Sequence, residues 1–250
     1  MQLSYDPIRR LALAVGTLSV IRVRVAGSVA PGELRASVGL YPLVGLLVGA
    51  FPAAALLLPI PALPRAVLAL ALWVGVTGAL HLDGWADSCD AAFAPPRATP
   101  AESRERRLAI LKDPRVGVFG VAGLVLLLLG KWTALAGAAP LVPLLAAPLA
   151  RWTMVFALHA HPAARPDGLA AALGRDVPLG MATLTAALVL VPLTLMAVEP
   201  WRVAVAVGIG VAAGLGVAAF LAHRFGGVTG DVLGAAGEAA ELAVLWALLA

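Results

Sequence analysis

The sequence has little charge: only 13% of its 250 residues are Asp, Glu, Lys or Arg, whereas 61% are hydrophobic. A soluble globular domain carries about 25% charged and about 45–50% apolar residues, so this chain lacks the charge to cover a globule in water. Intrinsic disorder is also excluded, because disordered chains combine low hydrophobicity with high net charge. The composition indicates an integral membrane protein, and we expect the lipid bilayer as a partner and no nucleic acid.

Cysteine and long polar segments are almost absent as well. The single cysteine, Cys89, excludes an internal disulfide framework and a cysteine-rich metal site. The longest polar connection runs only from about Phe93 to Arg115. We therefore expect residues 1–250 to form one membrane domain.

What the chain has instead is a series of long apolar runs. A helix that crosses the hydrocarbon core needs about 20 mostly apolar residues. The last run carries Glu238 and Glu241, so we predict an all-α transmembrane bundle of six to seven helices. The runs cover residues 37–58, 62–82, 116–132, 134–150, 177–198, 203–222 and 232–249.

The N-terminal stretch from Ile8 to Ala26 has a short apolar core with arginines on both sides. A signal peptide has its basic residues before the apolar core and small residues after it. We therefore expect a retained amphipathic helix at the membrane interface.

The positions of the basic residues predict the orientation of the bundle. If the N-terminus is cytoplasmic and all seven runs span, then of the 18 Lys and Arg residues all but Arg65, Lys131 and Arg202 fall on the cytoplasmic side. Cytoplasmic connections of membrane proteins carry such an excess. The asymmetry predicts that this end of the bundle faces the cytoplasm.

A first acidic cluster ends the second apolar run. Asp83, Asp87 and Asp90 are spaced i, i+4, i+7, which places three carboxylates on one face of a helix. Oxygen ligands on a stiff scaffold suit a hard divalent cation, with Mg²⁺ preferred. The alternative is a solvated acidic helix end. It leaves unexplained why other acids also lie in or against apolar runs, where ionisable groups are costly and usually functional.

A second cluster precedes the last run and reads Gly226-Gly227-Val228-Thr229-Gly230-Asp231. Its glycines would let backbone N–H groups approach a phosphate closely. Glu238 and Glu241 follow at spacings that place them on the same helix face as Asp231. The alternative is a flexible turn before a tightly packed helix.

The basic counterpart is the segment Lys112-Asp113-Pro114-Arg115, just before the third run. Arginine binds phosphate with two parallel hydrogen bonds, and lysine adds a point charge. Arg104, Arg106 and Arg107 we attribute to the positive-inside bias alone. Arg151 lies among apolar residues and either reaches the cytoplasmic interface or pairs with an acidic cluster.

All of these clusters fall on the side of the membrane that the basic residues define. Acidic metal-holding faces, a glycine loop and basic residues at one mouth are typical of phosphoryl transfer, in which the protein positions groups and neutralises charge through Mg²⁺. We therefore expect a nucleotide-like substrate.

These segments resemble cobalamin synthase, a family also called adenosylcobinamide-GDP ribazoletransferase. The likeness extends from about residue 20 to the C-terminus. It rests on Ser37–Gly45, His81–Asp90, Leu111–Gly117 and Gly226–Asp231 with Glu238 and Glu241.

The resemblance implies an Mg²⁺-dependent enzyme of the bacterial inner membrane. α-Ribazole, or its 5′-phosphate, would attack the cobinamide-linked phosphate of adenosylcobinamide-GDP and release GMP. It implies metal ligands at Asp83, Asp87 and Asp90, with Asp231, Glu238 and Glu241 as further catalytic acids. The substrate-binding set would be His81, Lys112, Asp113, Arg115, Arg151, Gly226, Gly227, Thr229 and Gly230. Self-association into a homo-oligomer stays open.

Two alternative functions stand beside this one. A CDP-alcohol phosphotransferase that makes phospholipid shares the Asp-Gly-x-x-Ala core of the first cluster but has a longer aspartate spacing. A cation-coupled secondary transporter would also carry intramembrane acids, although near the bilayer midplane and in repeated halves.

Overall fold

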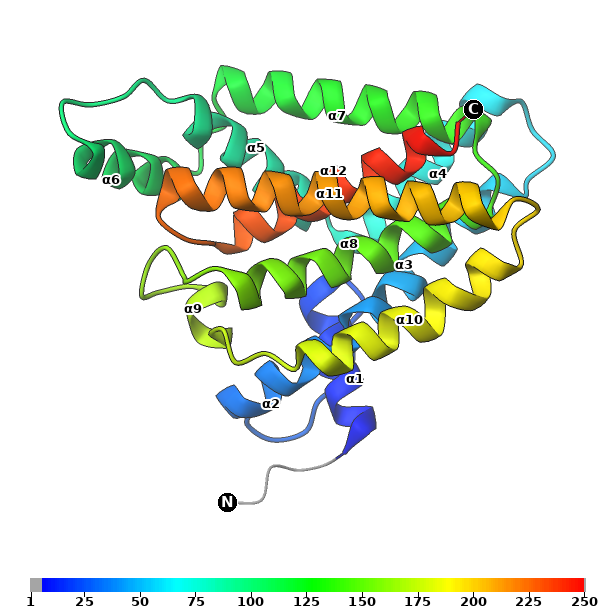
Figure 1. The fold of residues 1–250 in the computed structure, drawn as a ribbon, viewed down its shortest axis with the longest axis horizontal. Helices are drawn as coiled ribbons and strands as arrows, with labels where there is room; N and C mark the ends of the chain where they lie inside the picture. The colour runs from blue at the N-terminus through cyan, green and yellow to red at the C-terminus, as the bar shows by residue number, and fades with distance from the viewer. Residues whose placement is uncertain (1–5, 250) are drawn as a thin grey trace.

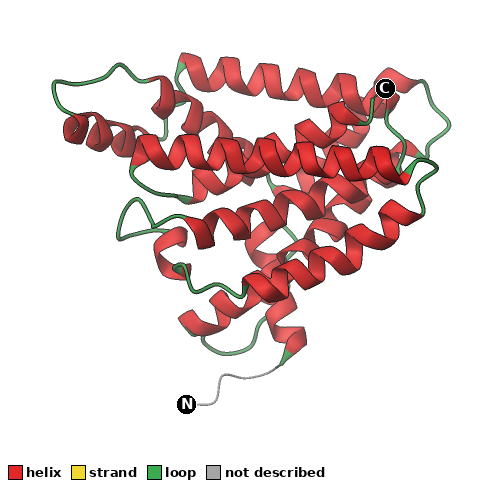
Figure 2. Cartoon of the chain, in the orientation of Figure 1, coloured by secondary structure: helices red, strands yellow, loops and turns green. Residues whose placement is uncertain are grey.

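In the computed structural model, which describes residues 6–249, the chain consists of helices and loops (Figures 1 and 2). The predicted all-α bundle is confirmed. The β-type pairing within this range is one isolated bridge between Ala163 and Val228. The longer helices are α3 (Tyr41–Leu56), α4 (Ala62–Thr77), α5 (Leu80–Phe93), α7 (Val118–Gly137), α8 (Leu141–Ala160), α10 (Leu179–Leu195), α11 (Pro200–Phe225) and α12 (Gly230–Ala247). The shorter ones are α1 (Pro7–Leu18), α2 (Pro31–Ser37), η1 (Val38–Leu40), α6 (Pro100–Ile110) and α9 (Leu169–Leu173).

Every predicted apolar run contains a helix, but the turn between the third and fourth runs is misplaced. We expected it near residue 133, with Lys131 on the outer side of the membrane. The helix instead continues to Gly137, and the turn lies at residues 138–140. The physical reason is that Lys131 is buried and ion-paired, so its charge does not mark a loop.

The second run also differs from the prediction, because it contains a sharp bend. Helix α4 ends at Thr77, and Gly78 and Ala79 both adopt left-handed backbone conformations, with φ of 61° and 58°. Helix α5 then leaves at 89° to α4. In its first turn His81 and Leu82 are buried, whereas Asp83 is exposed.

Four segments are long and apolar enough to cross a membrane, and the bent pair α4 and α5 makes a fifth if it counts as one span. The four segments are Gly32–Leu56, Val118–Gly137, Leu141–Ala160 and Pro200–Phe225. Helix α10 is apolar but has only 17 residues, and α12 carries three acids. These two helices explain why fewer segments meet the criterion than the six or seven predicted.

The N-terminal helix is present, but it ends at Leu18 rather than near residue 26. It buries Leu13, Ala14, Val15 and Leu18 against the bundle, while Ile8 is exposed. The following segment is extended and bonds to the end of α4 through Val20 N–H and the Val76 carbonyl, at 2.9 Å. The amphipathic character of this helix therefore serves packing on the bundle.

The segments that carry the sequence motifs gather at one end of the molecule, at the left of Figure 1. Helix α6, the loop with α9 and the turn between α11 and α12 all lie there. The turns between α7 and α8 and between α10 and α11 lie at the opposite end, with the C-terminus.

A buried ion-pair network joins the helices at the centre of the bundle. Glu241 of α12 pairs with Lys131 of α7 at 2.5 Å and also with Arg151 of α8. Lys131 pairs in addition with Glu238 and lies 4.9 Å from the centre of the Trp73 ring. The two acids and two bases balance in formal charge, which is the condition under which charges are tolerated in an apolar interior.

Replacing Lys131 by alanine leaves two buried glutamates with a single cation. We expect Lys131→Ala to reduce stability by about 3–5 kcal/mol, the cost of removing one partner of a buried ion pair. The matched control is Arg202→Ala, which removes an exposed pair with Glu199 at 2.8 Å and is expected to cost less than about 1 kcal/mol. Thermal or denaturant unfolding in the same detergent measures both, and equal losses would contradict the prediction.

Candidate active site

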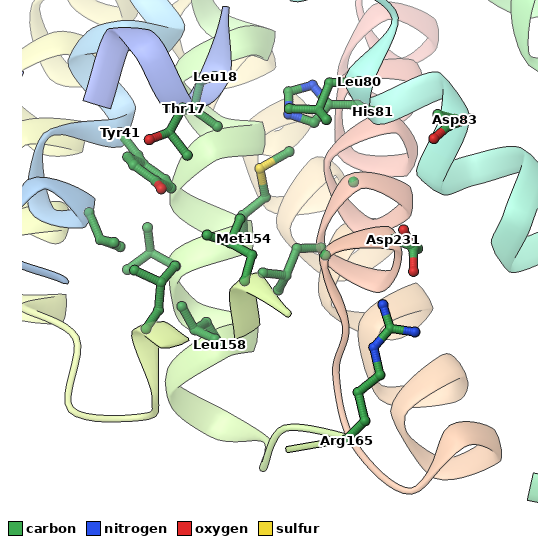
Figure 3. Close-up of a pocket in the computed structure, with 17 residues that line it drawn as sticks. Thr17, Leu18, Tyr41, Leu80, His81, Asp83, Met154, Leu158, Arg165 and Asp231 are labelled. Carbon is green, nitrogen blue, oxygen red and sulfur yellow. The ribbon is translucent and has the colours of Figure 1, made fainter. Parts of the chain in front are cut away.

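A cavity of about 270 Å³ opens beside the ion-pair network. Its walls come from α1, α3, α5, α8, α9 and α12, and they are mostly apolar (Figure 3). The ionisable side chains among its lining residues are Tyr41, His81, Asp83, Arg165 and Asp231. An apolar hollow with a few convergent polar groups is the usual form of a ligand site.

Asp83 and Asp231 reach the same cavity because α5 crosses α12 at very short range. A Cβ atom at Gly84 would lie 2.9 Å from both the Cα and the carbonyl oxygen of Asp231, so a larger side chain there would separate the helices. One carboxylate from each predicted acidic cluster therefore reaches this cavity. Thr229, which caps the start of α12, donates a hydrogen bond from Oγ1 to Asp231 Oδ2 at 3.0 Å and orients that carboxylate.

The other two aspartates of α5 have different surroundings. Asp87 is half-buried and lies within electrostatic range of Asp83 and Asp231. Asp90 accepts hydrogen bonds from the backbone N–H groups of Gly117 and Gly120, at 2.7 and 2.8 Å. A carboxylate that accepts N–H groups at a helix start stabilises that start, so Asp90 anchors α7 to α5.

The predicted metal site is not a closed cluster in this structure. Among residues 6–249, no group of three or more His, Cys, Asp or Glu side chains is arranged so as to hold a metal ion. The spacing along α5 predicted three carboxylates on one helix face, whereas the tertiary structure gives Asp90 two backbone partners.

The glycine loop between α11 and α12 pairs with the segment that follows α8. Val228 N–H donates to the Pro162 carbonyl at 2.8 Å, and Ala164 N–H donates to the Val228 carbonyl at 2.9 Å. Gly227 has φ of 150°, and a Cβ there would lie 2.7 Å from the Ala164 nitrogen. The Gly227 N–H group donates a hydrogen bond to the Ala222 carbonyl at 2.8 Å. These bonds give the loop a packing role, and phosphate binding by Gly226, Gly227, Thr229 and Gly230 stays a prediction.

This pairing positions a residue that the sequence did not single out. Arg165 follows directly after Ala164 and extends toward Asp231 across the cavity wall (Figure 3). Its surrounding sequence, His161-Pro162-Ala163-Ala164-Arg165-Pro166-Asp167, is a polar, proline-rich connection beside a motif-bearing end of the bundle. That composition was the available signal, but it gave no reason to prefer Arg165 over the neighbouring loop arginines.

The basic segment before α7 lies at the surface. Lys112 pairs with Asp167 at 2.8 Å, and Asp167 in turn lies 3.8 Å from Arg165. Asp167 thus links Lys112 to the cavity wall, and the hydrogen bond from Lys112 lowers the pKa of the Asp167 carboxyl. Arg115 instead pairs with Asp113 at 2.8 Å and lowers the pKa of that carboxyl to about 2 by hydrogen bonding.

The comparisons with known proteins agree with the family resemblance of the sequence motifs. The model of the cobalamin-5-phosphate synthase family matches residues 10–249. The chain belongs to this family. Curated relatives named adenosylcobinamide-GDP ribazoletransferase include those of Deinococcus radiodurans, 40% identical over 95% of this chain and 84% of the relative, and of Pseudomonas aeruginosa strain PAO1, 39% identical over 97% and 98%. No solved structure matches significantly.

In this chain the remaining predicted site residues belong to the ion-pair network. Of the two alternatives for Arg151, pairing with an acid is confirmed: it is fully buried against Glu241. Its Nη2 lies 3.3 Å from Nδ1 of His81, which also lines the cavity. A guanidinium can only donate, so Nδ1 accepts and the neutral ring carries its proton on Nε2. The network therefore contacts the cavity wall through His81.

Gly227→Ala tests the loop pairing that positions Arg165. The new methyl group would collide with the segment around Pro162 and Ala164, and alanine disfavours this backbone conformation by about 1–3 kcal/mol. We expect faster hydrogen exchange at the Ala164 and Val228 amides. Gly208→Ala is the control, because a Cβ there meets nothing within 4 Å. If hydrogen exchange at these two amides is unchanged in Gly227→Ala, the close approach of Gly227 to Pro162 and Ala164 is not needed for the loop pairing.

Proposed function

We propose that this chain is an adenosylcobinamide-GDP ribazoletransferase. A ribose hydroxyl of α-ribazole, or of its 5′-phosphate, attacks the phosphate attached to cobinamide. A new oxygen–phosphorus bond forms, the bond to the leaving phosphate breaks, and GMP departs while the hydroxyl proton passes to a base. Membership of the family and the names of the relatives support this reaction.

The observation that carries the proposal is the meeting of Asp83 and Asp231 with Arg165 at one cavity. A ribose hydroxyl needs a proton acceptor within about 3 Å during attack, and the two aspartates supply candidates from different helices. Arg165 supplies a planar donor for phosphate oxygens. A cavity of about 270 Å³ accommodates a diphosphate with part of a ribose, so the corrin ring stays outside.

We further propose Mg²⁺ as the cofactor, held by Asp83 and Asp87 with help from Asp231. Mg²⁺ is commonly bound by one or two carboxylates together with substrate phosphates, and it keeps several waters. A site that the substrate completes needs no closed protein cluster, which agrees with the absence of one in residues 6–249. When bound, the ion would neutralise charge on the diphosphate.

The other predicted site residues take supporting roles in this proposal. Glu238, Glu241 and Arg151 position α12 and His81 through their ion pairs, and Asp90 positions α7 through its backbone bonds. Lys112 acts at the cavity mouth through Asp167. Asp113 and Arg115 neutralise one another at the surface until a phosphate draws the arginine away.

We also propose that the protein lies in the inner membrane and that its motif-bearing end faces the cytoplasm. With Lys131 and Arg151 buried, the other end of the bundle retains Arg65 and Arg202 as its basic residues, so the charge asymmetry persists. In the variant Arg175→Cys, made in a Cys89→Ser background, the new thiol should react with an impermeant maleimide only after the membrane has been permeabilised. Labelling of intact cells would reverse the assignment.

Asp83→Asn and Asp231→Asn test the reaction. Each is expected to lower the rate of GMP release from adenosylcobinamide-GDP and α-ribazole by about 10²–10⁴-fold, because each removes a charge at the reacting phosphate or the proton acceptor. Asp176→Asn, at an exposed loop position, is the control and should turn over normally. Release of CMP from a CDP-alcohol substrate by the wild type would favour the phospholipid enzyme, and no nucleotide release would favour a transporter.

The metal proposal has a separate test in the Mg²⁺ dependence of turnover. Chelation by EDTA should abolish GMP release, and Mg²⁺ should restore it. Asp87→Asn should raise the Mg²⁺ concentration for half-maximal turnover by about tenfold or more, because it removes one charged ligand. Near-normal turnover of Asp87→Asn over the whole Mg²⁺ range would remove Asp87 from the metal site.

A further inference from the structure

A strongly basic groove lies between α6 and the end of α11, outside the cavity described above. Its volume is about 800 Å³, and it is open to the surface. The ionisable side chains that line it are all basic: Arg97, Arg104, Arg107, His223 and Arg224. The acids of α6, Glu102 and Glu105, are not among its lining residues. We call the hollow lined by Arg97, Arg104, Arg107, His223 and Arg224 the basic groove.

The arginines of the basic groove approach one another without a carboxylate between them. Nη1 of Arg107 donates to the backbone carbonyl of Arg224 at 3.5 Å, and the charge of Arg224 is close enough to act on the Arg107 guanidinium. Burial and the nearby charge of Arg224 lower the pKa of Arg107. The Nε atoms of both arginines are buried without a hydrogen-bond partner among the described residues. Like charges held together in this way destabilise the protein unless an anion neutralises them.

The groove is also held in shape. Arg104 donates hydrogen bonds to the carbonyls of Ala164 and Gly226, at 3.0 and 3.5 Å. The guanidinium carbon of Arg224 lies 5.5 Å from the centre of the Phe220 ring. If these arginines only set the orientation of the chain in the membrane, they would have to lie on the cytoplasmic side but would not have to line the same groove. Here side chains from α6, from α11 and from the segment just before α6 line one hollow.

We propose that the basic groove is a second anion-binding site, distinct from the cavity, for a phosphate monoester or diester. Planar guanidinium groups bind phosphate oxygens with paired, charge-assisted hydrogen bonds. Such a phosphate is carried by a nucleotide and by the headgroup of an anionic phospholipid. Either source reaches this end of the bundle.

The test measures binding rather than turnover, so failure of the transferase assignment leaves it unaffected. One arm titrates inorganic diphosphate into the detergent-solubilised protein by calorimetry, with EDTA present so that no metal-dependent binding at the aspartates contributes. The other arm compares the melting temperature in phosphatidylcholine nanodiscs with and without phosphatidylglycerol. Both arms use the wild type, the double variant Arg107→Gln/Arg224→Gln and the single variant Arg97→Gln.

We expect the wild type to bind diphosphate or to melt at a higher temperature with phosphatidylglycerol, and the double variant to lose about tenfold in affinity or most of the shift. Arg97→Gln keeps the test decisive if the double variant folds poorly. Among residues 6–249 the Arg97 side chain makes no hydrogen bond or ion pair, and its backbone N–H, which the substitution keeps, donates to Ser103 Oγ at 2.8 Å. Arg106→Gln, on the same helix but outside the groove, should behave as wild type.

Diphosphate binding identifies a soluble phosphate as the source, and a response to phosphatidylglycerol alone identifies a headgroup. A wild type that responds to neither, or groove variants that respond like Arg106→Gln, would overturn the proposal.

Discussion

Glu241 lies at the centre of an apolar bundle, and its carboxylate holds Lys131 of one helix and Arg151 of another. Burying these charges is costly, and their mutual neutralisation is what makes the arrangement tolerable. The pairs hold α12 against α7 and α8 at one depth. Because α12 also carries Asp231, the same pairs determine where that carboxylate lies relative to α5.

The acids of the chain thus separate into two groups with different physical tasks. Glu238 and Glu241 are ion-paired in the interior, and Asp90 is bonded to backbone N–H groups of α7. Asp83 and Asp231 line the cavity, with Asp87 beside them. The proposed divalent ion needs carboxylates whose oxygens remain available, which favours the second group as the reacting set.

The basic residues divide in a comparable way. Lys131 and Arg151 serve the interior, Arg165 faces the cavity, and Arg107 and Arg224 face the groove on the far side of the Gly226–Thr229 turn. The turn itself lies between the cavity and the groove, because Gly226 lines the groove whereas Gly230 and Asp231, at the start of α12, line the cavity. The cavity and the basic groove therefore share one loop.

The sequence by itself determined the class of fold, the grouping of the motifs at one end and the helix face that each set of acids shares, because apolar runs, loop charges and helical spacing are local properties. Tertiary structure decided the rest. The meeting of Asp83 with Asp231, the burial of Lys131 and the helix cap by Asp90 each depend on a partner distant in the chain. Arg165 gained its position only when the loop after α8 paired with Val228. Spacing along a helix tells which side chains share a face, but only the packing of other helices against that face decides whether each carboxylate meets a cation, a backbone N–H group or an open cavity.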